Sequence, residues 1–167
     1  MPLIYLLKNA MKFNLNINQL SNSRQNVLHK ACGFGIEETV NFLIQNAKKY
    51  NIDLNLRDRI GDTPFHLACS MGKLETVEML LKNSKQHKIN VVSVNINGMD
   101  GQASAEEKGH TDIVSLIKEW NRKQSNEELT SNVHDEVLFQ LEGIQHTGDP
   151  RLANAIKLIK ELKENKN

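Results

Sequence analysis

Four side chains in this sequence are of types that often carry chemistry: His29, His66, Cys32 and Cys69. Histidine is a common general base and metal ligand near neutral pH, and two cysteines could form a disulfide or share a metal ion. The motifs that usually accompany such chemistry are missing: the sequence has no Gly-x-Ser-x-Gly elbow, no phosphate-binding glycine loop and no His-Glu-x-x-His pair. Three further histidines lack a cysteine or histidine at ligand spacing and are expected at the surface: His110, His134 and His146. We therefore predict no catalytic, cofactor-binding or metal site.

Composition narrows the class of protein. The 167 residues include 21 basic and 20 acidic side chains, a net charge of +1, which argues against a surface for nucleic acid or an anionic membrane. The longest apolar run, residues 3–7, is far shorter than the ~20 residues of a membrane span and makes a poor secretory signal. Two cysteines are too few for a secreted disulfide framework. We expect a cytoplasmic protein, with the nucleus as the alternative, and neither nucleic acid nor membrane as its partner.

The residues around both histidines belong to a longer internal repeat. Residues 26–35 align with residues 63–72 at a shift of 37 positions. The same shift pairs residues 9–14 with residues 46–51, and it places Gly109 in step with glycines of the earlier copies. One period that links four stretches indicates a repeat protein, in which each copy packs on its neighbours.

The copy at residues 61–68, Gly-Asp-Thr-Pro-Phe-His-Leu-Ala, followed by a glycine and by Val-Glu-Met-Leu-Leu at 77–81, resembles the ankyrin repeat. The family pattern is G-x-T-P-L-H-x-A, then a glycine, then a V-x-L-L helix. The resemblance is good at 26–44, degenerate at 98–117, and covers about residues 3–120. It implies an all-α solenoid of helix-turn-helix repeats joined by β-hairpin-like loops.

The signature residues have structural roles in this pattern. Thr63 is expected to cap the first helix, and Pro64 to occupy its first position, where the missing N–H costs nothing. Glycines are expected where each first helix ends in a left-handed turn, which glycine adopts without strain: Gly35, Gly72 and Gly109. The spacing exceeds the usual 33 residues of the family by about one helical turn, which predicts a longer second helix.

For the four chemistry-bearing side chains, the resemblance favours structural roles. In the family this histidine is a hydrogen-bonding residue that ties one loop to the next, which is the role implied for His29 and His66. Cys32 and Cys69 would lie on stacked helices ~8–10 Å apart, whereas a disulfide needs Cα atoms within ~7 Å. We therefore expect both cysteines to be buried free thiols.

The expected organisation has three parts. Residues 1–120 form the ankyrin solenoid: a half repeat at 1–20, copies at about 24–55 and 61–92, and a degenerate copy at 98–120. The last copy lacks the threonine, proline and histidine, so its first helix is expected to be short or irregular. Residues 121–132 read as a polar linker, and residues 133–164 as a helical pair. This pair is interpreted as a capping repeat, with a partner-binding helix hairpin as the alternative.

In the ankyrin family, partners lie along the hairpin tips and the exposed side of the first helices. Carried over to this chain, that surface has six candidate residues: Arg57, Arg59, Ile60, Lys30, Phe34 and Met71. Arginine, methionine and large apolar groups are enriched at interface centres. The alternative is that Phe34 and Met71 pack between repeats.

The sequence thus predicts a non-enzymatic adapter or inhibitor that binds a partner protein. One alternative is an effector like the short ankyrin proteins that viruses and intracellular bacteria deploy against host signalling. Another is a piece of a larger multidomain ankyrin protein, and a third is an enzyme with scattered site residues. A homodimer is also expected, because Leu3, Leu6 and Leu7 would lie on a second helix with no first helix to cover them.

Overall fold

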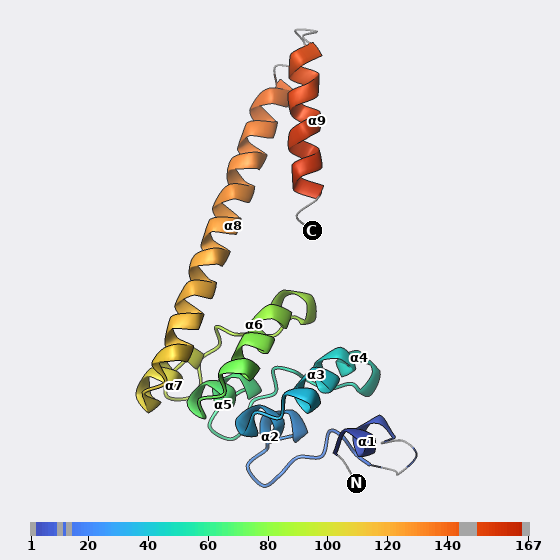
Figure 1. Cartoon of the computed structure of the whole chain (residues 1–167), viewed down its shortest axis with the longest axis vertical. Helices are drawn as coiled ribbons and strands as arrows, with labels where there is room; N and C mark the ends of the chain where they lie inside the picture. Colours follow the sequence, from blue (N-terminus) through green and yellow to red (C-terminus); the bar gives the residue numbers. More distant parts are fainter. Residues whose placement is uncertain (1–2, 10–11, 13–14, 144–149, 165–167) are drawn as a thin grey trace. The chain divides into compact units, whose positions relative to one another are not determined.

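The computed structural model describes residues 3–9, 12, 15–143 and 150–164, and the chain divides into two compact units, residues 1–118 and 119–167. Its helices (Figure 1) are α1 Leu3–Lys8, α2 Val27–Phe34, α3 Glu37–Gln45, α4 Ala47–Tyr50, α5 Pro64–Ser70, α6 Leu74–His87, α7 Gly101–Lys108, α8 Thr111–Gly143 and α9 Pro150–Glu164. The described residues contain no strand, which agrees with the all-α class predicted from the repeat.

The first unit is a stack of helix pairs. The first helices α2, α5 and α7 pack side by side, and the second helices α1, α3 and α6 form a neighbouring row (Figure 1). Within each copy the two helices pack on one another, as α2 does on α3 and α5 on α6. This arrangement confirms the predicted solenoid.

The core is built from the same positions of successive copies. Val40 and Val77 are fully buried in the second helices, and Ala31 and Ala68 are buried in the first helices. Burying a valine side chain stabilises a fold by about 1.5–3 kcal/mol. Repeating that burial every 37 residues holds neighbouring copies together.

The inserted turn is present but takes two forms. In one copy α6 runs without interruption to His87, whereas in the preceding copy a break at Asn46 separates α3 from α4. Both copies then end at the same repeat position in a left-handed residue, Asn51 with φ 51° and Lys88 with φ 54°. The helix end is therefore set by the repeat, although only one copy keeps a continuous helix.

The first helix of the degenerate copy is regular, contrary to the sequence expectation. α7 has eight residues, and the Asp100 side chain accepts a hydrogen bond from the Ala103 N–H at 2.8 Å. Gly109 ends the helix with φ 78°. The expectation was wrong because Asp100, at the repeat position of Thr63, is an equally good cap.

The linker predicted at residues 121–132 is also wrong, because this segment lies inside α8. It contains no proline or glycine and is rich in good helix formers, and the Lys123–Glu119 pair at 2.9 Å adds i,i+4 support.

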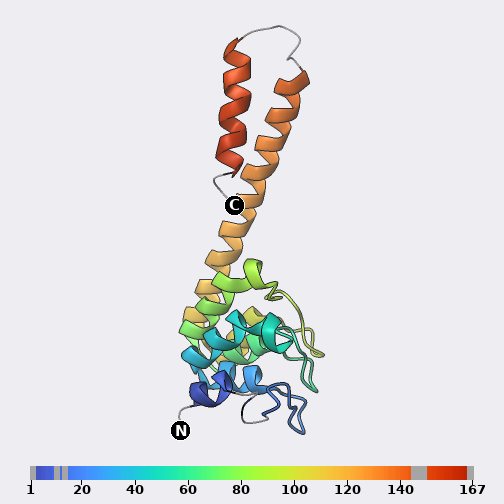
Figure 2. The same cartoon turned by 90° about the vertical axis from the view of Figure 1, so that its right-hand side faces the viewer.

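In the second unit, α9 lies beside the carboxyl-terminal part of α8 (Figures 1 and 2), and Lys160 pairs with Glu142 at 2.8 Å. Leu138 and Ile156 are buried there. A helical pair is thus present, and its role as a cap stays a prediction.

Candidate protein-binding surface

Three loops of the first unit project on one side, one above another (Figure 2). They are the tips at residues 21–25, 58–62 and 95–99. Each is closed by a backbone hydrogen bond of 2.9 Å from its first residue to its last, as from the Asp58 N–H to the Asp62 carbonyl. The loops therefore share one conformation, repeated along the stack.

Hydrogen bonds also join each tip to the next. The Arg59 N–H donates to the Ser23 carbonyl at 3.1 Å, and the Ile96 N–H donates to the Ile60 carbonyl at 3.1 Å. Side chains reinforce these links, since the Gln25 amide donates to the Asp58 carboxylate at 2.8 Å. The three tips thus form a continuous, hydrogen-bonded edge.

The buried histidines hold this edge to the first helices. His66 Nε2 lies 3.1 Å from the Met99 carbonyl, which can only accept, so Nε2 carries the proton. Nδ1 then accepts from the Thr63 N–H at 3.2 Å and from the Thr63 hydroxyl at 2.8 Å. His29 reaches the Asp62 carbonyl in the same way, at 3.2 Å. These contacts are structural, and burial lowers the pKa of His29, which favours its neutral form.

The cysteines are also structural. Cys32 and Cys69 are buried and unpaired, and burial raises the pKa of both thiols. A protonated, buried thiol is neither a good nucleophile nor a metal ligand. The described part of the chain also contains no group of three or more His, Cys, Asp or Glu side chains that could hold a metal ion.

The candidate residues at the tips differ from one another. The Arg57 guanidinium donates a hydrogen bond to the Val94 carbonyl in the following loop, and it lies against Gly61. Arg57 therefore helps to hold two loops together. Arg59 and Ile60 are exposed as well, and their role in binding a partner stays a prediction.

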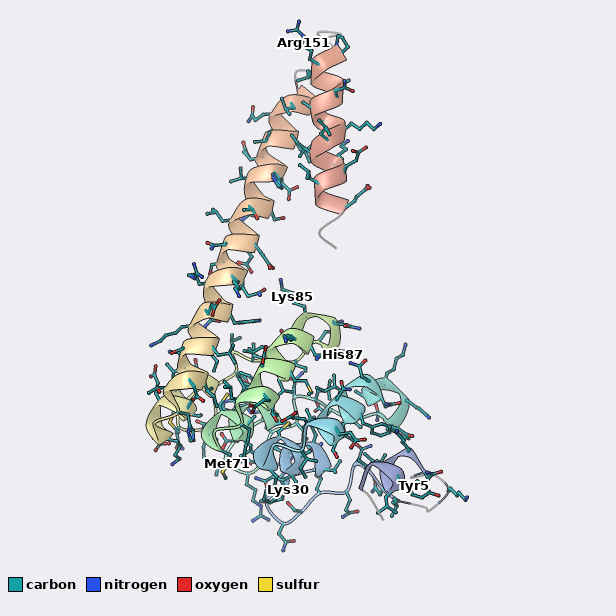
Figure 3. The ribbon with its side chains drawn as sticks, viewed as in Figure 1. Tyr5, Lys30, Met71, Lys85, His87 and Arg151 are labelled. Carbon is teal, nitrogen blue, oxygen red and sulfur yellow. The ribbon has the colours of Figure 1, made fainter. Side chains whose placement is uncertain are left out.

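The candidate residues on the first helices come together around one hollow. Lys30 and Phe34 lie on α2, and Met71 lies at the end of α5; Lys30 and Met71 are labelled in Figure 3. Phe34 is 72% exposed and Met71 58% exposed. The hollow has a volume of about 270 Å³, and its lining consists of Gln25, His29, Lys30, Gly33, Phe34, Leu67, Met71 and Lys73.

Sequence reasoning missed Lys73. Its aliphatic stem packs over Gly35, with Cδ 3.0 Å from where a Cβ would stand. His110, one repeat later, lies over Gly72 in the same way and reaches the Ser70 carbonyl at 3.1 Å through Nε2, so it is not a simple surface residue. The shift of 37 aligns Lys73 with His110 and could have indicated both contacts.

The amino-terminal edge is partly covered by its own chain. Leu7 is only 5% exposed and lines a hollow of about 420 Å³ together with residues 15–17 of the following loop, and Leu6 is half-buried. The side chain of Leu3 lies outside the described residues. The expectation of three uncovered leucines was therefore wrong for Leu7, whereas Leu15 and Leu20 are 45% and 40% exposed.

The homodimer stays a prediction for this edge. We expect light scattering to show a mass that rises with concentration, and Leu15→Ser/Leu20→Ser to reduce that rise. The reason is that the exposed apolar surface of both leucines would be buried in the dimer. A strictly monomeric wild type at high concentration would contradict it.

Stacked helix pairs with aligned loop tips define the chain as a helical repeat protein of the solenoid class. The family model for ankyrin repeats (3 copies) matches residues 3–93, and the chain belongs to the ankyrin-repeat family. No curated protein matches the chain. Among the described residues, no helix is both long and apolar enough to cross a membrane.

Proposed function

We propose that this chain is a non-enzymatic adapter or inhibitor that binds a partner protein through its loop tips and the exposed face of its first helices. Ankyrin repeats are generally protein–protein interaction modules, and the family is typically non-enzymatic. The observation that carries the proposal is the exposure of Phe34 and Met71 beside one hollow.

These two side chains are suited to anchor a partner. They occupy the same repeat position on successive first helices and leave most of their apolar surface in water. Fully burying one such side chain is worth about 1.5–3 kcal/mol. Arg59 and Lys30, both exposed, would lie at the rim of the interface, where charged groups direct association more than they add affinity.

The test is the double variant Phe34→Ser/Met71→Ser. We expect the variant to capture at least tenfold less partner protein than the wild type does from an extract of cells that express the protein. Quantitative mass spectrometry measures the captured amount. The circular dichroism spectrum of the variant should not change, because surface changes usually alter stability by no more than ~0.5 kcal/mol.

A matched control exists in the second unit, where Phe139 is 72% exposed and Leu158 59% exposed. Phe139→Ser/Leu158→Ser removes a similar apolar surface and should retain capture. If the control pair loses the partner and the first pair keeps it, the binding site belongs to the helical pair instead.

A further inference from the structure

We infer that the hollow between Phe34 and Met71 binds an acidic segment of the partner, with an apolar side chain in the hollow and flanking carboxylates on Lys30 and Lys73. This inference rests on the proposed function and adds the chemistry of the bound segment. It follows from which charges line the hollow, which of them are already paired, and what its apolar residues can hold.

The lining carries positive charge without compensation. Its eight residues include Lys30 and Lys73 but no aspartate or glutamate. The acidic residues of the loop edge already accept hydrogen bonds from other groups. Asp58 accepts from the Gln25 amide and from the Ile60 and Asp62 N–H groups. Both carboxylates of the edge, Asp58 and Asp62, are only 8% exposed.

Several lysines on other surfaces of the molecule have carboxylate partners. Lys82 pairs with Glu78 at 2.9 Å, and Lys118 pairs with Glu106 at 3.5 Å. Within the described residues, Lys30 forms no ion pair with a carboxylate, and neither does Lys73. The two cations of the hollow are therefore available to an acidic group from another molecule.

Lys73 is also held in place. Its stem packs over Gly35 and the residue lines the hollow, so part of the side-chain entropy that binding would cost is already lost. A further cation lies on the loop edge. Gln25 lines the hollow and bonds to Asp58, and the residue after Asp58 is the exposed Arg59.

The apolar part of the lining favours a peptide over a nucleic acid. Leu67 lines the hollow together with the exposed side chains of Phe34 and Met71, and these three apolar side chains would be left without a contact by a phosphate group alone. An aliphatic or aromatic side chain of a partner would be buried there, with carboxylates before and after it meeting the lysines. Opposite charge across an interface also speeds association and excludes wrong partners.

A display library of random 12-residue peptides tests this without assuming a partner sequence. Selection is run on the full-length protein, on Lys30→Glu/Lys73→Glu, and on Lys48→Glu/Lys88→Glu. The last variant changes the net charge equally, at exposed lysines outside the hollow. We expect wild type and the Lys48/Lys88 variant to select apolar residues flanked by Asp or Glu. The Lys30→Glu/Lys73→Glu variant should select peptides that carry Lys or Arg in place of the Asp or Glu.

Fluorescence anisotropy on the selected peptides then measures the effect. An acidic peptide should bind wild type at least tenfold more tightly than Lys30→Glu/Lys73→Glu, and raising the salt concentration should narrow that difference. Phe34→Ser/Met71→Ser should weaken the same peptide at least tenfold.

The inference is overturned if all three proteins select the same peptides, or if no peptide depends on Lys30 and Lys73. It is overturned equally if a labelled single-stranded oligonucleotide binds the hollow more tightly than the selected peptides. None of these results tests the proposed function, which is decided by whether Phe34→Ser/Met71→Ser still captures the partner. A protein that captures its partner through Phe34 and Met71 but selects no acidic peptide retains the function and loses this inference.

Discussion

Replacing His66 with alanine is expected to lower the free energy of unfolding of the first unit by about 3 kcal/mol or more. His66 is 1% exposed, and its ring bridges the Met99 carbonyl and the Thr63 N–H. Alanine leaves the buried Thr63 N–H without a partner, which costs about 1–3 kcal/mol, and the Met99 carbonyl keeps only its bond from the Asn95 N–H. Removing the ring also leaves a cavity, which adds to the loss.

Urea denaturation followed by circular dichroism measures this effect. His134→Ala is the matched control, because His134 is only half-buried in α8 and its loss should change stability by no more than ~0.5 kcal/mol. A His66→Ala protein with the wild-type unfolding midpoint would contradict the structural role of this histidine. A catalytic activity lost at unchanged stability would point to the enzyme alternative instead.

The 37-residue shift was sufficient to predict a repeat protein because it aligns chemistry as well as apolar residues, and the resemblance of one copy to the ankyrin repeat then predicted the solenoid. His29 and His66 fall at one repeat position, and in both copies the ring reaches a carbonyl of the following loop. Helix capping was harder to predict by comparing residue types between the copies. Asp100 stands where the pattern has threonine, and recognising it as a cap requires the physical property that both residues share.

Boundaries were predicted less well where composition was the only guide. Residues 121–132 are polar, but polarity alone does not end a helix, and the segment lacks the glycine or proline that would. At Arg24 the residue type likewise fails to predict the local structure. Arg24 is not a glycine, yet it has φ 63° at the repeat position of Gly61 and Gly98. There the conformation is imposed by the repeated loop rather than by the residue.

The candidate surface shows the same limit. Phe34 and Met71 could be placed together by the repeat alone, because equivalent positions of stacked helices are neighbours. The role of Arg57 could not be, since its guanidinium bonds to a carbonyl 37 residues away. A long side chain on a repeated loop can face a partner or the next loop, and only the structure distinguishes the two.

Replacing Gly101 with alanine is expected to destabilise the first unit by about 1–3 kcal/mol, the usual cost of overpacking a core. Gly101 is the first residue of α7, and an added Cβ would stand 2.3 Å from Cε1 of Phe65 and 3.1 Å from Sγ of Cys69. Phe65 is only 2% exposed, so its ring has little room to move. The absence of a side chain at Gly101 is therefore what lets α5 and α7 pack closely.

The direction of the stability change caused by Gly101→Ala is informative, because helix propensity alone predicts that alanine stabilises the protein. Glycine-to-alanine changes inside helices stabilise by about 0.5–1 kcal/mol when space allows. Gly33→Ala is the matched control: Gly33 lies inside α2, and an added Cβ would meet only Leu67 Cβ at 3.8 Å, so it measures helix propensity without a clash.

Combining Gly101→Ala with Phe65→Leu isolates the contact. The smaller side chain should recover part of the loss caused by the alanine, so the two changes together should cost less than the sum of their separate effects. Thermal and urea unfolding of the four proteins measure this coupling. If Gly101→Ala proves as stable as wild type, or if the two changes simply add, then the ring of Phe65 yields to the new methyl group and the close packing of α5 on α7 does not depend on glycine.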